Sequence, residues 1–142
     1  MKNVFSLLFV SAALVFSSCS KDDDSPSGAS AAVATSLKDG TWHISSYSDN
    51  GVDETSDFSS FTFTFASSGT VTATNSVLTA TGTWSSGRDD SKHKLYLGFS
   101  TPALFEEIDE DWEIVTQSST QVSLKHVSGG SGETDLLVFT KN

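Results

Sequence analysis

The chain has 142 residues, of which 8 are Lys or Arg and 18 are Asp or Glu, for a formal net charge of −10 at pH 7. Such an acidic chain argues against nucleic acid as a partner, and against binding of an anionic membrane by the folded part. Its length suits one domain with a single core, and its single cysteine excludes a disulfide within the chain.

The N-terminal segment has the order of an export signal. Met1-Lys2-Asn3 is basic, residues 4–16 are mostly apolar, and two serines follow before Cys19. The apolar run is shorter than the roughly 20 residues that cross a bilayer as a helix. We therefore interpret residues 1–18 as a signal peptide and expect no membrane helix in the mature protein.

Cys19 stands where this signal ends, and a lone cysteine in an exported protein needs an explanation other than a disulfide. Phe16-Ser17-Ser18-Cys19, an apolar residue followed by two small ones and the cysteine, resembles the lipobox of bacterial lipoproteins. The resemblance implies that Cys19 carries a lipid that anchors the mature protein in a membrane. The alternative is an ordinary signal peptide that is cleaved nearby and leaves a free thiol.

The residues after the cysteine bear on location. Lys21-Asp22-Asp23-Asp24 is either a solvated part of a tether or, because it directly follows Cys19, similar to the export tag of Bacteroidota lipoproteins. That tag implies a lipid-anchored protein on the outer face of the outer membrane. Residues 25–36 have almost no large apolar side chain, so we expect residues 19–36 to be a flexible tether and residues 37–142 the folded domain.

The folded domain is predicted to be all-β, since apolar and polar residues alternate over short runs that turn residues separate. In Phe61-Thr62-Phe63-Thr64-Phe65 the phenylalanines lie on one face and the threonines on the other. Expected strands cover residues 42–44, 61–65, 70–74, 78–84, 94–99, 112–116, 121–126 and 135–141. About eight strands predict a small closed antiparallel up-and-down barrel, which has no open edge.

One short helix is expected between the fifth and sixth strands. Thr101 is a candidate cap, and Pro102 suits the first helical position. Leu104, Phe105 and Ile108 would then share an apolar face that lies over one end of the barrel, with the neighbouring glutamates turned outward.

Several motifs together resemble a known family. Gly40-Thr41-Trp42 matches the Gly-x-Trp pattern on the first strand of lipocalins, and Gly82-Thr83-Trp84 repeats it. With Asp111-Trp112-Glu113-Ile114 and the closing residues 137–141, the set is similar to the short lipocalin-like domains of Bacteroidota lipoproteins. The resemblance implies a lipocalin-like (calycin) barrel over residues 37–142, in which only Lys141 could pack across Trp42 as the basic residue of the family does.

The predicted function is that of a non-catalytic binding module for a small apolar or glycan ligand. An eight-stranded barrel of short strands has room to be filled by side chains or to hold one small ligand. The alternative is a solid barrel that binds or inhibits a protein partner, such as an envelope protein, through its loops and outer surface. The candidate ligand contacts are inward-facing residues and a histidine expected at a barrel mouth: Trp42, Phe63, Trp84, Trp112 and His126.

No pattern with specific spacing indicates catalysis or a metal. The three histidines are scattered and lack the close spacing of a zinc site. Asn50-Gly51 is better explained as a hairpin turn than as part of a calcium loop. Serines lack a Gly-x-Ser-x-Gly elbow, and acidic residues 106–111 are typical of a solvated face. We therefore expect no catalytic residue, no metal ligand, no cofactor and no enzyme activity.

Overall fold

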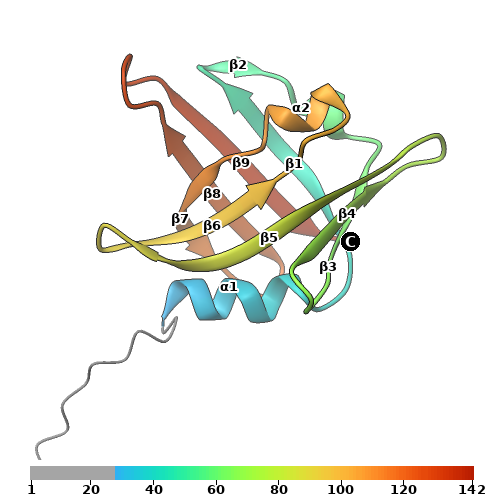
Figure 1. The fold of residues 1–142 in the computed structure, drawn as a ribbon, viewed down its shortest axis with the longest axis horizontal. Coiled ribbons are helices and arrows are strands. Elements are labelled where there is room, and N and C mark those ends of the chain that lie inside the picture. The colour runs from blue at the N-terminus through green and yellow to red at the C-terminus, as the bar shows by residue number, and fades with distance from the viewer. Residues whose placement is uncertain (1–27) are drawn as a thin grey trace, which may run out of the picture.

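The computed structural model describes residues 28–142, so the predicted signal peptide, Cys19 and Lys21-Asp22-Asp23-Asp24 lie outside the described residues. Eight strands form a closed antiparallel barrel in which each strand pairs with its neighbours in chain order, and β1 pairs with β9 to close it (Figure 1). They are β1 (Trp42–Asp49), β3 (Thr62–Phe65), β4 (Thr70–Thr74), β5 (Thr79–Asp89), β6 (Lys92–Gly98), β7 (Asp111–Gln117), β8 (Gln121–Val127) and β9 (Thr134–Lys141). The predicted eight-stranded up-and-down barrel is therefore confirmed.

Helix α1 (Ala29–Leu37) corrects the prediction of a flexible tether over residues 19–36 for its last eight residues, 29–36, whereas residues 19–27 lie outside the described residues. Val33 and Leu37, four residues apart on one helix face, are fully buried. Helix α1 packs against β5, β6 and β7 at the end of the barrel where β1 begins (Figure 1). An Ala-rich segment has high helix propensity but is too short to be a stable helix alone. The barrel supplies the apolar surface that this segment lacks, so the folded domain includes residues 29–36.

The opposite end of the barrel is covered by α2 (Thr55–Phe58) and α3 (Ala103–Glu106). Helix α3 confirms a short helix at the predicted place, with Phe105 in it and Ile108 just after it fully buried, but it is a single turn and Pro102 rather than Thr101 is the N-cap residue. The Phe105 ring lies 5.0 Å from the Phe61 ring, centroid to centroid, and 5.6 Å from the ring of Phe58 in α2. Helix α2 was not predicted.

Aromatic and aliphatic side chains fill the space between these helices. Burial alternates along β3 as predicted, because Phe63 and Phe65 are buried while Thr62 and Thr64 are exposed. The Phe63 ring contacts Phe139 from β9, which flanks β1 on its other side, at 5.2 Å between centroids. The barrel therefore has a continuous core that runs from α1 to α3.

The short strand β2 (Val52–Asp53) extends β1 by a hairpin. Its two-residue turn consists of Asn50 and Gly51, whose φ angles are 47° and 82°. Both angles lie in the left-handed region that this hairpin type requires, and Asn and Gly are the residues that tolerate it best. The structure thus agrees with the interpretation of this segment as a turn.

Within residues 28–142, no helix has both the length and the apolar character needed to cross a membrane.

Candidate functional site

The predicted ligand contacts inside the barrel all belong to the core. Trp42, Phe63 and Trp112 are fully buried, and Trp84 is 8% exposed. Each indole N–H donates a hydrogen bond of 2.9–3.1 Å to a backbone carbonyl, that of Leu37, Ala66 or Ile108. Neither free apolar surface nor a free donor is left for a ligand at these four side chains. Sequence parity placed them correctly inside the barrel but could not show that neighbours fill the space around them.

The predicted contact between Lys141 and Trp42 is present. The Nζ atom of Lys141 lies 5.9 Å from the centroid of the Trp42 ring and 2.6 Å from a carboxylate oxygen of Asp39. These groups sit at the α1 end of the barrel, where they join the first strand to the last. Their role is structural.

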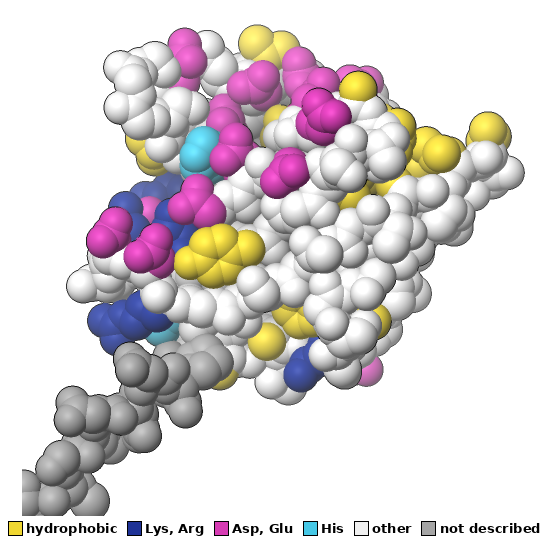
Figure 2. All heavy atoms as spheres, in the orientation of Figure 1, with side chains coloured by type: hydrophobic (Ala, Val, Ile, Leu, Met, Phe, Trp, Pro, Cys, Tyr) yellow, Lys and Arg dark blue, Asp and Glu magenta, His cyan; other side chains and the backbone are white. Residues whose placement is uncertain are grey.

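Most carboxylates among residues 28–142 gather at the other end, over α2, α3 and the adjoining strand ends (Figure 2). We call this surface the acidic end, and it consists of Asp49, Asp53, Glu54, Asp57, Glu106, Glu107, Asp109, Glu110, Asp111, Glu133 and Asp135. Within the described part of the chain, Lys94 is the one Lys or Arg that forms an ion pair with it, through Asp111 at 3.2 Å. The acidic end therefore carries a large excess of negative charge.

Two carboxyl groups at the acidic end have raised pKa values, partly because neighbouring carboxylates repel their negative charge. Burial raises the pKa of the Glu107 carboxyl above its usual range, and the charges of Glu54, Asp57 and Asp49 raise it further. Burial also raises the pKa of Asp49, together with a hydrogen bond to Asp135 and the charge of that residue. A cation brought to this end would relieve the repulsion between these groups.

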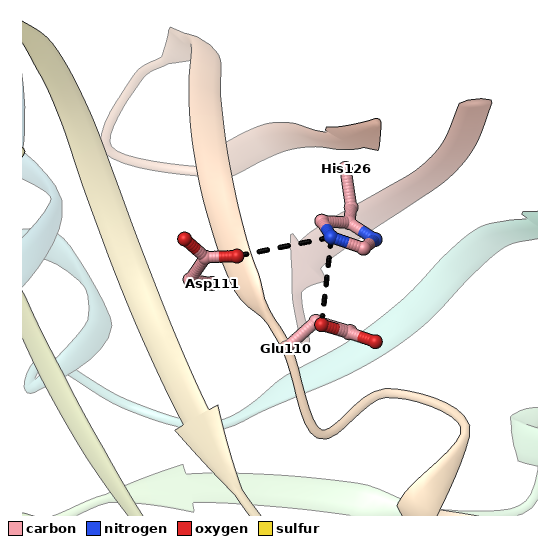
Figure 3. A group of neighbouring side chains, drawn as sticks. All are labelled: Glu110, Asp111 and His126. Atoms are coloured by element: carbon pink, nitrogen blue, oxygen red, sulfur yellow. Dashed lines mark ion pairs between the residues drawn. The ribbon is translucent and has the colours of Figure 1, made fainter. Parts of the chain in front are cut away.

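His126 lies at the edge of the acidic end with three carboxylates around it, of which Figure 3 shows those of Glu110 and Asp111. Its Nε2 atom is 3.5 Å from Glu110 Oε2 and 3.8 Å from Asp111 Oδ1, while its Nδ1 atom is 3.4 Å from Asp135 Oδ2. The imidazole packs against the Trp112 ring, and 17% of its side chain is exposed. His126 thus lies near one end of the barrel, and its predicted role as a ligand contact stays a prediction.

Strand register explains this grouping. Glu113 of β7 pairs with Lys125 of β8, which sets the start of β7 beside His126 near the end of β8. His126 is also directly opposite Asp135 of β9. The prediction of no metal ligand weighed the spacing of the histidines, a calcium loop around Asn50-Gly51 and the acidic residues 106–111, but not His126 together with carboxylates of neighbouring strands. Acidic residues just before the inward-facing Trp112 were the signal that could have revealed the group.

The other two histidines are separate from this group. His43 lies 2.7 Å from an amide oxygen of Asn142, and His93 contacts Ser30 of α1. Neither was predicted to bind a ligand.

A second feature is an open groove of about 480 Å³ on the outer surface of β4, β5 and β6. Hydroxyl groups line much of it, from Thr70, Thr81, Thr83 and Ser100, and Asp109 of the acidic end lies at its edge. Gly82 shapes this wall, because a Cβ atom there would lie 2.3 Å from the Gly98 carbonyl oxygen. The lining combines these hydroxyl groups with apolar surface, including that of Phe99.

Comparison with known proteins supports the fold of this chain and gives no information on its function. No family model matches the chain, and no curated protein matches it by sequence. Among solved structures, the crystal structure of a DUF4847 family protein from Bacteroides vulgatus ATCC 8482 is similar, with a TM-score of 0.52 and 19% sequence identity. The likeness covers 78% of this chain and 97% of that one. At this identity it supports a shared β-barrel fold.

Proposed function

We propose that this protein is a non-catalytic interaction module, anchored to the outer membrane by a lipid on Cys19, that binds a basic protein segment through its acidic end. The observation that carries the proposal is the concentration of unneutralised carboxylates on one closed end of a filled barrel. A positively charged segment is the partner class that this surface would attract and orient.

Packing favours a partner outside the barrel over a ligand inside it. The side chains predicted as internal ligand contacts are buried in one continuous core, with helices over both ends. A molecule entering the barrel would have to displace Phe105 or Leu37, both of which are fully buried. The alternative that the sequence left open, a solid barrel acting through its outer surface, is therefore the better explanation.

Location at the cell surface is supported by the sequence. The lipobox resemblance at Phe16-Ser17-Ser18-Cys19 implies an anchor, and Lys21-Asp22-Asp23-Asp24 resembles an export tag of Bacteroidota. A structurally similar protein from Bacteroides vulgatus is in keeping with such an origin. On the outer face of the outer membrane, the acidic end would meet envelope proteins rather than cytoplasmic ones.

The partner class is tested by binding of a lysine-rich peptide to the full chain. The wild type should bind the peptide, and added salt should weaken binding because exposed charges are screened over about 10 Å at 0.1 M. The double variant Asp57→Asn/Glu106→Gln removes two exposed charges from the acidic end and should slow association several-fold.

A matched control is Asp89→Asn/Asp90→Asn, which removes two exposed charges from the β5–β6 hairpin. This variant should bind the peptide like the wild type. Equal losses in both variants would mean that net charge alone attracts the peptide, and the proposal would be wrong. Binding that depended on Thr81 or Thr83 instead would favour the hydroxyl-lined groove.

Location is tested separately by replacing Lys21-Asp22-Asp23-Asp24 with alanines. Protease added to intact cells should cleave the wild type and spare the variant, since a lipoprotein without its tag would face the periplasm. Cleavage of both proteins to the same extent would exclude the export tag while leaving the interaction proposal intact.

A further inference from the structure

We infer that Glu110, Asp111 and His126 form a binding site for a divalent transition metal ion of the zinc type. One ligand atom from each residue, an imidazole nitrogen or a carboxylate oxygen, lies within 4.8 Å of the other two. This site is smaller than the acidic end as a whole and does not depend on the function proposed above.

The arrangement of acceptors calls for a cation between them. The His126 Nδ1 atom faces Asp135 Oδ2 at 3.4 Å, and in the tautomer that carries the proton on Nδ1 it donates a hydrogen bond to this carboxylate. In a neutral imidazole, Nε2 then directs a lone pair toward Glu110 and Asp111. Three acceptors that face one another repel unless a positive charge lies among them.

A proton alone would fill this space poorly. Charge-assisted N–H···O hydrogen bonds are about 2.7–2.9 Å long, whereas Nε2 is 3.5 Å and 3.8 Å from the two carboxylate oxygens. Zinc binds nitrogen and oxygen at roughly 2.0–2.2 Å, which sets tetrahedral ligand atoms about 3.4 Å apart. The two separations from Nε2 therefore match the edges of a metal site to within a few tenths of an ångström, and the two carboxylate oxygens lie within 4.8 Å of each other.

Neighbouring groups hold two of the three ligands in place. Asp135 orients the imidazole from β9, as outer carboxylates do around metal-bound histidines. Lys94 holds Asp111 Oδ2 at 3.2 Å and leaves the other oxygen, Oδ1, directed toward His126. Because Lys94, Asp111, His126 and Asp135 come from paired strands of the closed barrel, the sheet fixes their relative positions, and Glu110 directly precedes β7.

The ligand set selects the class of metal. Calcium and magnesium prefer sites made wholly of oxygen atoms, whereas an imidazole with carboxylates suits zinc and related first-row ions. Three protein ligands leave a fourth position for water or for a group from a partner.

The site is tested by calorimetric titration of Zn²⁺ into the full chain carrying Cys19→Ala, which removes a competing thiolate. This protein should bind one equivalent of Zn²⁺. Glu110→Gln and His126→Gln should each weaken binding by at least tenfold, and Asp135→Asn by about 10–100-fold, the range for outer-shell residues. Thermal unfolding without metal identifies any variant that is misfolded, and Co²⁺ absorption gives the coordination number independently of affinity.

Two matched controls are Glu106→Gln, a charge change at the same end, and His43→Gln, a histidine outside the group. Both should bind Zn²⁺ within about twofold of the Cys19→Ala protein, and excess Ca²⁺ should not displace it. The inference is wrong if no stoichiometric binding occurs, if Glu106→Gln weakens binding as much as Glu110→Gln, or if Ca²⁺ competes. Failure here would leave peptide binding through Asp57 and Glu106 unaffected, so the two proposals are judged separately.

Discussion

The ammonium group of Lys141 lies 5.9 Å from the centre of the Trp42 ring and thereby connects the last strand of the barrel to the first. Gly40 makes room for it, since a Cβ atom there would lie 2.8 Å from Lys141 Cε, and its φ of +81° is one that L side chains rarely adopt. The Gly-x-Trp pattern is therefore explained by two needs, space for the lysine stem and a buried ring beneath it.

Replacing Lys141 with Met should lower the free energy of unfolding by about 1 kcal/mol, the size of a partly exposed cation–π contact. The ion pair with Asp39 adds little, because 81% of that side chain is exposed. Urea unfolding measures the change. Lys141→Arg should retain the cation–π contact, and Lys38→Gln, a change at an exposed residue, should leave stability unchanged. If Lys141→Met lowers stability no more than Lys38→Gln does, the contact between Lys141 and Trp42 contributes nothing to stability.

Helix α1 should stabilise the barrel although the sequence pattern assigned it to a tether. Leu37 is fully buried and its carbonyl accepts the Trp42 indole hydrogen bond. Leu37→Ala should therefore cost about 2–5 kcal/mol of unfolding free energy. Thr35→Ala alters an exposed side chain of the same helix and should change stability by no more than about 0.5 kcal/mol. If the two variants are equally stable, α1 is not part of the folded unit.

The acidic end should make stability depend on pH through Glu107. Its raised pKa means that the folded state holds the proton more tightly than the unfolded state does, so this carboxyl reduces stability as pH rises from its usual value of 4.5 through the raised one. Glu107→Gln should increase the unfolding free energy at pH 7 by less than about 1 kcal/mol, with the gain fading below pH 4.5.

Glu113 provides a control of opposite sign. A hydrogen bond from Lys92 holds the pKa of this carboxyl below its usual range, with Lys125 contributing. Glu113→Gln should therefore lower stability at pH 7, and the loss should vanish in acid as the wild-type carboxyl is protonated. Unfolding titrations at several pH values measure both variants. If Glu107→Gln and Glu113→Gln both raise the unfolding free energy at pH 7, or both lower it, this account of the acidic end is wrong.

Lipid on Cys19 is a prediction that cell labelling can decide. Radiolabelled fatty acid should enter the wild-type protein and should be absent from Cys19→Ala, because the chain has no other cysteine. Ser18→Ala keeps a small residue before the cysteine and serves as a control that should still be labelled. If Cys19→Ala is labelled as strongly as the wild type, Cys19 is not the lipidated residue, and the proposed anchor is wrong.

The barrel and the outline of its core could be predicted because alternation encodes which face of a strand is buried. Trp42, Phe63 and Trp112 were all placed on the inner face, and α3 was located from Pro102 and the apolar residues that follow. Helix α1 was missed because its small residues are helical only where a barrel end buries Val33 and Leu37. The composition of this segment does not show that the barrel provides an apolar surface for it to pack against.

The candidate site was less accessible to sequence reasoning than the fold. His126 could be placed at a barrel mouth by parity, yet its approach to Glu110 depends on the register between β7 and β8. That register includes an irregularity between Ile114 and Thr116, which no alternation pattern reveals. Residue spacing along the chain therefore does not show that His126 lies beside Glu110 and Asp111.

The contents of the barrel remain the most decisive property to measure, and Phe63 is the best probe because it lies mid-strand between the two ends. It is fully buried against Phe139 and Phe105, with ring centroids at 5.2 Å and 6.2 Å. Phe63→Ala should leave a cavity and cost about 3–5 kcal/mol, out of the roughly 5–15 kcal/mol that stabilises a domain.

Thr62→Ala, an exposed change in the same strand, controls for effects on β3 itself and should alter stability by no more than about 0.5 kcal/mol. Urea unfolding of the unlipidated chain measures both variants. A side chain that lined an open ligand pocket would already lack contacts on one side, so its truncation would cost much less. A loss of unfolding free energy above about 2.5 kcal/mol for Phe63→Ala therefore supports the filled barrel. A loss under about 1 kcal/mol would mean that the barrel holds a ligand cavity, and the proposal of binding through the acidic end would be wrong.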